Sequence, residues 1–263
     1  MREPIIIIPY IHESEIASLR TKLIYLPVFF WEDTGRIGSD LAYQTLWNMF
    51  PDRDVIILHS DMAAMPEDAD NKWYYELLET VNKYPEAGIF GTTLLYPAKD
   101  DSNNYYIQHA GGQFLNGEAI HYGGGLNLYN STASRPLESD TGQYSNVREV
   151  PWCTFGGVYI RRSVINDCGP FDPSYYWTYY RDVDYCLTAR SRGWKIYQTP
   201  IRLLHFEGRD NKRLIDNKRL EQQTINHQIF FKKWANSSLL ENINRVVDNE
   251  KSTPKHKDKA KKK

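Results

Sequence analysis

Two clusters of polar residues stand directly after apolar runs, where a chain could hold a metal ion. His59-Ser60-Asp61 follows a run that ends at Leu58, and His205 ends a second run. A carboxylate at the mouth of a parallel sheet can hold a divalent cation that bridges phosphate oxygens, and an imidazole can complete the site. An Asp at a strand end can also cap the next helix, and a single His is more often structural. The residues alone predict an Asp61–His205 metal site and leave the structural interpretation open.

A third cluster, Arg181-Asp182-Val183-Asp184, begins a predicted helix and follows the aromatic segment 175–180. An Asp at a helix N-cap stabilises the helix by about 1 kcal/mol, which would be a sufficient structural role. A carboxylate beside aromatic rings that stack on sugars can also be the general base for a sugar hydroxyl. Both interpretations remain open at this point.

The elements that must position these clusters alternate along the first hundred residues. The predicted order is strand 4–10, helix 16–23, strand 25–31, a helix capped by Ser39, strand 54–58, helix 73–81 and strand 88–95. This alternation is typical of an α/β protein with a doubly wound parallel sheet. Ligands of such sheets bind at the carboxyl ends of the strands, so we expect the polar residues that end the first three strands to face one crevice.

The pattern changes after residue 100. The polar loop 127–148 has almost no periodicity and is predicted to be a lid or a binding element. Segment 150–161 reads as one strand interrupted by Gly156-Gly157, where a ligand or another backbone would approach closely. Further elements are a helix that ends at Gly193, two strands separated by Pro200 and a helix over 216–235. His109 and His121 lie beside glycines, and we assign them to packing or turn hydrogen bonds.

Composition excludes several classes of protein. The chain has 263 residues, of which 41% are hydrophobic, 14% aromatic and 25% charged, so it is not disordered throughout. Its net charge of −1 argues against a surface that binds nucleic acid. Three cysteines are too few for a disulfide scaffold and are read as small core residues. With no apolar stretch of membrane-spanning length, we expect a cytoplasmic protein.

The charge is unevenly distributed. Residues 251–263 contain seven lysines and one aspartate, a net charge of +6 that leaves −7 for the rest of the chain. Such a tail could contact an anionic membrane surface peripherally or bind nucleic acid, or it could simply be a solvated end. We expect it to be disordered, and we expect no nucleic-acid partner.

An ordered series of motifs in the C-terminal half resembles the family 2 glycosyltransferases of the GT-A fold, in particular their rhamnosyltransferase-like branch. The resemblance covers residues 4–235 and is weaker in the N-terminal half. The series is Gly156-Gly-Val-Tyr-Ile-Arg-Arg162, Cys168-Gly-Pro-Phe-Asp172, Arg181-Asp-Val-Asp-Tyr-Cys-Leu-Thr-Ala-Arg190, Gly193-Trp-Lys-Ile with Pro200, and His205-Phe-Glu-Gly208.

The resemblance implies a mixed central sheet flanked by helices and one GT-A domain over residues 4–248. Within it, 4–100 would bind the nucleotide and 101–248 would bind the acceptor and carry catalysis, with a basic tail at 249–263. The implied activity moves a hexosyl or deoxyhexosyl group from a nucleoside-diphosphate sugar to a glycan or glycoconjugate hydroxyl, as in polysaccharide biosynthesis. It would be inverting and would depend on Mn²⁺ or Mg²⁺.

The resemblance also implies roles by position. Asp61 matches the metal ligand of the Asp-x-Asp motif, His205 adds a metal contact, Asp182 is the base and Asp33 binds the nucleoside. Expected substrate contacts, including aromatic faces for sugar rings and arginines for phosphate, are Pro9, Tyr10, Asp33, Arg36, His59, Ser60, Trp152, Gly156, Gly157, Trp177, Tyr179, Arg181 and Arg209.

Two departures from the family pattern keep a second hypothesis in view. His59 stands where the family has the first Asp of Asp-x-Asp, and Arg181 stands where it has a Glu. A catalytically inactive protein that binds nucleotide sugars would also fit these replacements. A nucleotidyltransferase fits poorly, because no glycine-rich phosphate loop follows the first strand. A protein that acts only through its lysine tail would leave the acidic series unexplained.

Overall fold

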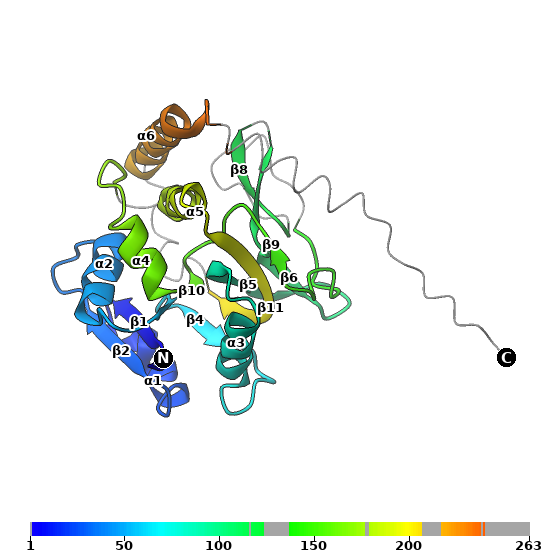
Figure 1. The fold of residues 1–263 in the computed structure, drawn as a ribbon. Helices are drawn as coiled ribbons and strands as arrows, with labels where there is room; N and C mark the ends of the chain where they lie inside the picture. The colour runs from blue at the N-terminus through cyan, green and yellow to red at the C-terminus, as the bar shows by residue number, and fades with distance from the viewer. Residues whose placement is uncertain are drawn as a thin grey trace.

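A mixed sheet forms the centre of the molecule (Figure 1). The computed structural model describes residues 2–115, 117–123, 137–176, 179–206, 217–237 and 239. In the main sheet the order is β2 (Val28–Glu32), β1 (Ile5–Tyr10), β3 (Val55–Leu58), β10 (Gly157–Ile160), β5 (Ala87–Lys99), β11 (Lys195–His205) and β4 (Met62–Ala64). Two further strands, β6 (Tyr105–His109) and β9 (Arg148–Glu149), pair with β5 and β11.

The direction of β10 makes the sheet mixed. β1 is parallel to both β2 and β3, as the alternation predicts. β10 enters between β3 and β5 and is antiparallel to both, whereas β11 is parallel to β5. The parallel sheet predicted from periodicity is therefore corrected, and the mixed sheet implied by the family resemblance is confirmed.

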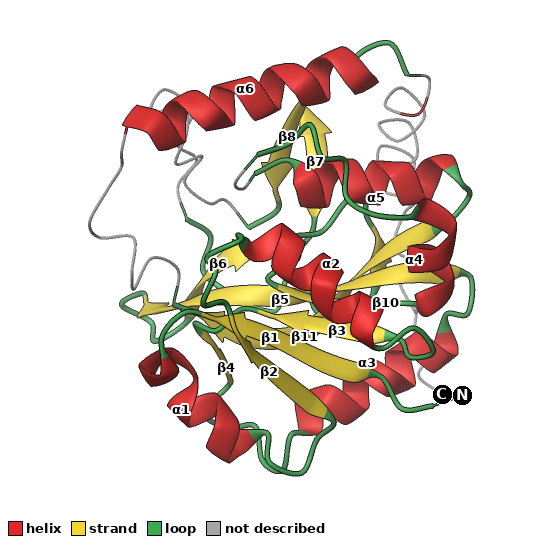
Figure 2. Cartoon of the chain, turned by 90° about the vertical axis from the view of Figure 1, so that its left-hand side faces the viewer, coloured by secondary structure: helices red, strands yellow, loops and turns green. Residues whose placement is uncertain are grey.

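Helices cover both faces of this sheet (Figure 2). On one face lie α2 (Ser39–Met49), α4 (Arg162–Cys168) and α5 (Arg181–Ser191); on the other lie α1 (Glu13–Lys22) and α3 (Lys72–Lys83). The apolar run in β1 follows from this, because Ile5 and Ile7 pack into one core and Ile6 and Ile8 into the other. A strand that is buried on both faces is continuously apolar rather than alternating.

The remaining helix packs away from the sheet. α6 (Asn217–Trp234) lies over α5 and over the hairpin of β7 (Gly112–Leu115) and β8 (Glu118–His121) (Figure 2). The buried Asp184 carboxylate fixes it, accepting hydrogen bonds from Lys233 Nζ at 3.0 Å and Trp234 Nε1 at 2.7 Å. Asp184 therefore has a structural role, which separates it from its neighbour Asp182.

Several predicted boundaries differ from the structure. Gly38, with φ of 89°, holds the N-cap position of α2 without a side-chain cap, so Ser39 is not the cap. Within segment 150–161, predicted as one strand, only β10 (Gly157–Ile160) is a strand, and it pairs with β3 and β5. Conversely, the two strands predicted around Pro200 are the single strand β11 (Lys195–His205), with a register shift around Pro200, which has no N–H to donate.

Parts of two predictions lie outside the described residues: segment 127–136 of the expected lid and the lysine tail. Within the described part of the chain, no helix is long and apolar enough to cross a membrane. The described part of the 127–148 segment is joined to the sheet by a bridge between Ser139 and Tyr106.

Candidate metal centre and active site

Three side chains converge where β3 ends and β11 ends. His59, Asp61 and His205 each offer a ligand atom, and these atoms all lie within 4.8 Å of one another. The backbone explains the convergence, because β4 begins directly after Asp61 and pairs with the end of β11, with Met62 opposite His205. The predicted Asp61–His205 pair is thus brought together, with Asp61 Oδ1 3.2 Å from His205 Nε2.

A hydrogen bond outside the cluster sets the proton position on His205. Its Nδ1 lies 2.6 Å from the Oε1 atom of the buried Gln108. An amide oxygen only accepts, so Nδ1 carries the proton and Nε2 presents its lone pair to the cluster. Such a partner on the other ring nitrogen is the usual support of a metal-binding His.

Three possible ligand atoms therefore face one point. His205 Nε2 lies 3.3 Å from His59 Nδ1 as well as 3.2 Å from the Asp61 carboxylate. Lone pairs this close repel one another unless a proton or a cation lies between them. Two imidazoles and one carboxylate are a donor set that can hold a divalent metal ion.

The protonation states suit a cation. Burial, and then the charge of His205, lower the pKa of His59 to about 4, so this ring is neutral at pH 7. Burial alone would raise the pKa of Asp61, but its interactions with His205 and His59 hold that pKa below its ordinary value. The cluster therefore offers a carboxylate and a neutral ring at neutral pH.

His59 thus lies among the candidate ligands rather than beside them, where we expected a substrate contact. Its ring stacks on Tyr43 of α2, with the ring centroids 6.1 Å apart. The neighbouring Ser60, another expected substrate contact, donates its hydroxyl to Glu15 Oε2 at 3.1 Å. That hydrogen bond joins the end of β3 to the first turn of α1.

Asp182 lies at the start of α5 and is half-buried. Burial raises the pKa of its carboxyl above the ordinary value. Hydrogen bonds donated by the Val183 N–H, the Thr154 hydroxyl and the Phe155 N–H lower the pKa and offset part of this rise. The Val183 N–H lies 2.9 Å from Asp182 Oδ1. A carboxylate with a raised pKa is a stronger base than one in water.

Tyr43 connects Asp182 to the cluster. Burial, and then the negative charges of both Asp61 and Asp182, raise the pKa of the Tyr43 hydroxyl. The same side chain stacks on His59. Of the three residues on which the sequence hypothesis depends, Asp61 and His205 are in contact, and the charges of Asp61 and Asp182 both act on Tyr43.

Arg181, an expected substrate contact, is paired with an acidic side chain of the protein. It forms an ion pair with Asp40 in the first turn of α2, and the two side chains are 11% and 14% exposed. Burial lowers the pKa of Arg181 to about 10, so it remains a cation at pH 7. The pair joins the starts of α2 and α5, which bear Tyr43 and Asp182.

The expected nucleoside contacts at β1 and β2 are engaged within the protein. The carboxylate of the buried Asp33 accepts the N–H groups of Ile37 at 3.0 Å and Gly38 at 3.3 Å. The Tyr10 hydroxyl accepts a hydrogen bond from Arg20 at 3.2 Å. The half-buried Pro9 pairs with a residue of β2, and Arg36 is exposed in the loop that Asp33 holds.

Three further expected contacts have packing roles. Trp152, expected to offer a face to a sugar, is only 2% exposed, because the imidazoles of His109 and His121 pack against its ring. A Cβ at Gly157 would lie 2.4 Å from Thr92 Oγ1, and one at Gly156 would lie 3.2 Å from Leu94. The two glycines thus leave room for neighbouring side chains.

Of the other expected residues, Tyr179 has left-handed backbone geometry, with φ of 73°, and its carbonyl accepts a hydrogen bond from Asn226 on α6 at 3.3 Å. Trp177 and Arg209 lie outside the described residues. The sequence analysis missed Gln108, Tyr43 and Thr154. Gln108 precedes His109 at the end of β6. The two polar residues at a strand end could have marked Gln108 as a candidate site residue.

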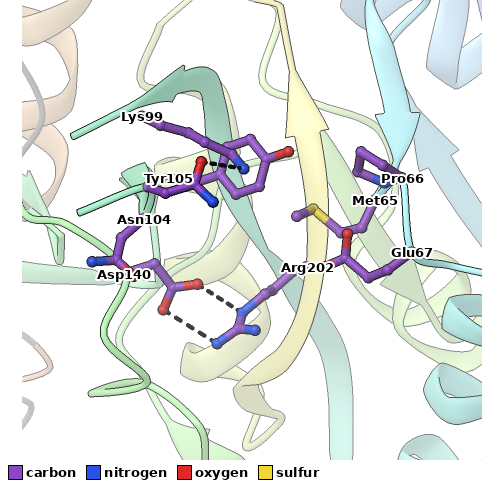
Figure 3. Close-up of a pocket in the computed structure, with 9 residues that line it drawn as sticks. Met65, Pro66, Glu67, Lys99, Asn104, Tyr105, Asp140 and Arg202 are labelled. Carbon is purple, nitrogen blue, oxygen red and sulfur yellow. Dashed lines mark hydrogen bonds and ion pairs between the residues drawn. The ribbon is translucent and has the colours of Figure 1, made fainter. Parts of the chain in front are cut away.

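A surface pocket lies away from this centre, beside β6 and β11 (Figure 3). Its lining carries charged groups that already have partners: Arg202 pairs with Asp140 at 2.7 Å, and Lys99 donates to Asn103 at 3.0 Å. A different set of residues from the metal cluster lines it, namely Met65, Pro66, Glu67, Lys99, Asn103, Asn104, Tyr105, Asp140 and Arg202.

Comparison with solved structures identifies the fold. GalNAc-T7, in a structure with UDP, GalNAc and Mn²⁺, matches 96% of this chain with a TM-score of 0.55 and 11% sequence identity. The chain has the GT-A fold. It spans 51% of the length of that GalNAc-T7 chain.

Two other similar structures align less closely. The mannosyltransferase PcManGT from Pyrobaculum calidifontis, in complex with GDP-Man and Mn²⁺, covers 97% of this chain and 76% of its own, with a TM-score of 0.49 and 12% identity. A197 from STIV covers 78% of this chain and 81% of its own, with a TM-score of 0.39 and 13% identity. No protein-family model and no curated protein sequence matches the chain.

Proposed function

We propose that this protein is a metal-dependent glycosyltransferase that moves a sugar from a nucleoside diphosphate to a hydroxyl of a glycan or glycoconjugate. The observation that carries the proposal is the convergence of His59, Asp61 and His205 at one edge of a GT-A sheet. The similarity to GalNAc-T7, whose structure contains UDP, GalNAc and Mn²⁺, supports it. Residues 4–100 would bind the nucleotide, and residues 101–248 would bind the acceptor and carry catalysis.

His59, Asp61 and His205 would hold the divalent cation. When bound, such an ion stabilises the negative charge that develops on a diphosphate leaving group. Gln108 keeps the Nε2 lone pair of His205 directed into the cluster. The lowered pKa values of His59 and Asp61 keep the His59 ring neutral and the Asp61 carboxylate charged at pH 7.

Asp182 is the proposed base of an inverting reaction. The acceptor oxygen attacks the anomeric carbon from the face opposite the diphosphate, and the bond between that carbon and the diphosphate oxygen breaks with its electron pair on the leaving group. Asp182 accepts the proton of the acceptor hydroxyl. Its raised pKa supports this role, because the charged carboxylate is less well solvated than in water.

Two observations favour a second candidate, a nucleotide-sugar-binding protein without catalysis. Arg181 stands in place of an expected acid and is paired with Asp40, and the Asp33 carboxylate is bound to backbone amides. This candidate predicts diphosphate affinity without sugar transfer and without donor hydrolysis. Membership of the family 2 rhamnosyltransferase-like branch and contact of the lysine tail with a membrane are further parts of the proposal.

A thermal-shift screen of UDP, GDP, dTDP and CMP, each with and without Mn²⁺, tests the proposal. Stabilisation follows RT ln(1 + [L]/Kd), so a ligand at about 100 times its Kd stabilises the fold by about 2.7 kcal/mol. We expect one diphosphate to raise the melting temperature only when Mn²⁺ is present. A flat response to all four nucleotides would contradict both candidates, and metal-dependent binding without sugar transfer would favour the second.

A further inference from the structure

Two histidines, His109 and His121, are connected through Thr154 to Asp182, the proposed base. His109, at the end of β6, is 1% exposed, and its Nδ1 lies 2.8 Å from Nδ1 of His121 at the end of β8. The other ring nitrogen of His109, Nε2, accepts the backbone N–H of Thr154 at 3.2 Å. The same Thr154 donates its hydroxyl to the Asp182 carboxylate.

These contacts determine the proton positions. A backbone N–H can only donate, so His109 Nε2 is unprotonated and its proton lies on Nδ1. That proton is donated to His121 Nδ1, which therefore accepts, and the proton of His121 lies on Nε2. Burial, followed by the charges of His121 and Arg148, lowers the pKa of His109 well below its ordinary value, consistent with a neutral ring.

Residues 154 and 155 form the connection to the base. The Thr154 hydroxyl and the Phe155 N–H both donate to Asp182, so two of the hydrogen bonds that offset its burial come from the segment that His109 holds. Loss of such donors disfavours the charged carboxylate and raises its pKa. The titratable groups that interact with Asp182 from neighbouring elements are Tyr43, Cys153 and Tyr180.

We infer that His109 and His121 are a positioning pair for Asp182: His121 fixes the tautomer of His109, and His109 holds the 154–155 segment that donates to the carboxylate. The catalytic meaning of this pair rests on the proposed function, since it assumes that Asp182 is the base. Trp152 packs against both imidazoles, and His109 is buried beneath it.

The test measures the pKa of Asp182 directly, by NMR titration of protein labelled with ¹³C at the aspartate carboxyls. Asp182→Asn assigns the signal. In His109→Leu we expect the pKa of Asp182 to rise by about one unit, the size expected for weakening one hydrogen bond to a charged group. His109→Gln, whose amide oxygen can accept the Thr154 N–H, should restore most of the wild-type value. An unchanged Asp182 pKa in folded His109→Leu would overturn the inference.

A second variant covers the case in which His109→Leu does not fold. His121 is exposed, so His121→Leu removes only the acceptor for His109 Nδ1. It should shift the Asp182 pKa in the same direction by a smaller amount, and no shift would overturn the inference. Nitrogen NMR of the wild type should show His109 protonated on Nδ1, and protonation on Nε2 would equally contradict it.

These readouts need neither substrate nor metal. A shifted Asp182 pKa in a protein that transfers no sugar would therefore keep the positioning contact and reject the proposed function. Sugar transfer by a protein whose Asp182 pKa does not change in the variants would keep the proposed function and reject the positioning contact.

Discussion

Polar side chains lie at the ends of β3 and β11 and at the ends of β1 and β2, but the two groups make different contacts. At β3 and β11, the possible ligand atoms of His59, Asp61 and His205 face one another. At β1 and β2, the polar groups of Asp33 and Tyr10 already have partners inside the protein. One end therefore has side chains arranged for a charged ligand, and the other uses similar side chains to hold its own loops.

The difference teaches which residues the reaction would depend on. Ligand atoms that face one another this closely need a shared proton or a cation between them. A carboxylate that accepts two backbone amides is fully explained by the stability of the fold. Functional effects of substitution should therefore concentrate at the β3–β11 end and at Asp182, while effects on stability should dominate at the β1–β2 end.

The largest expected effect is at Asp182. A general base contributes roughly 10²–10⁴-fold, so we expect Asp182→Asn to lower turnover by about a hundredfold or more. Steady-state kinetics with the donor found by the nucleotide screen measures this. Wild-type turnover in the variant would remove Asp182 from the role of base and would move the chemistry elsewhere along the sheet edge.

The same substitution has a stability consequence of known sign. The pKa of Asp182 is raised in the folded state, so the folded protein binds the proton more tightly than the unfolded chain does. This group therefore favours folding at acidic pH and opposes it as the pH rises above that pKa. We expect Asp182→Asn to melt at the same or a higher temperature than the wild type at pH 7. A markedly lower melting temperature would mean that the carboxylate is a structural group.

The pH dependence of the reaction follows from the same group. Asp182 must be deprotonated to accept a proton, so kcat/KM should fall as the pH drops through a pKa that lies above the ordinary value for Asp. A pH–rate profile of the wild type measures this. An acid limb at or below the pKa of an ordinary aspartate would argue against a buried base.

An intermediate effect is expected at Gln108. Loss of the partner of a metal-binding His typically costs about 10–100-fold in metal affinity. We expect Gln108→Leu to weaken Mn²⁺ binding by about that factor in calorimetric titrations, with Gln108→Glu as the matched control that keeps an acceptor for His205 Nδ1. Unchanged Mn²⁺ affinity in Gln108→Leu would show that the tautomer of His205 is set in another way.

The smallest effect, and the one that tests the other end of the sheet, is at Asp33. Removing the acceptor of two backbone amides leaves them unsatisfied, at a cost of about 1–3 kcal/mol. Denaturant unfolding should show this loss in Asp33→Ala, with nucleotide affinity falling no more than the stability of the loop requires. Unchanged stability together with a selective loss of nucleotide affinity would instead make Asp33 a nucleoside contact.

The alternation of apolar runs and amphipathic segments was enough to predict β1, β3, β5 and the helices between them, because local periodicity reports burial. It could not predict that β10 inserts antiparallel between β3 and β5, since strand pairing is a long-range property.

The candidate site was predictable in part for the same reason. Asp61 and His205 could be paired from their positions at strand ends. By contrast, the stacking of Tyr43 on His59 and the hydrogen bond of Gln108 to His205 depend on tertiary contacts between elements far apart in the sequence. For Trp152, the residue type suggested an aromatic face for a sugar ring, whereas packing against neighbouring side chains buries the ring.

The central claim is that one metal centre and one base share a single site, and paramagnetic NMR tests it most directly. Mn²⁺ broadens resonances near it, so substoichiometric Mn²⁺ added to ¹³C-aspartate-labelled protein should broaden the carboxyl signals of both Asp61 and Asp182. Asp61→Asn should abolish the broadening at Asp182. An Asp182 signal that stays sharp while Asp61 broadens, or broadening that survives Asp61→Asn, would contradict the account.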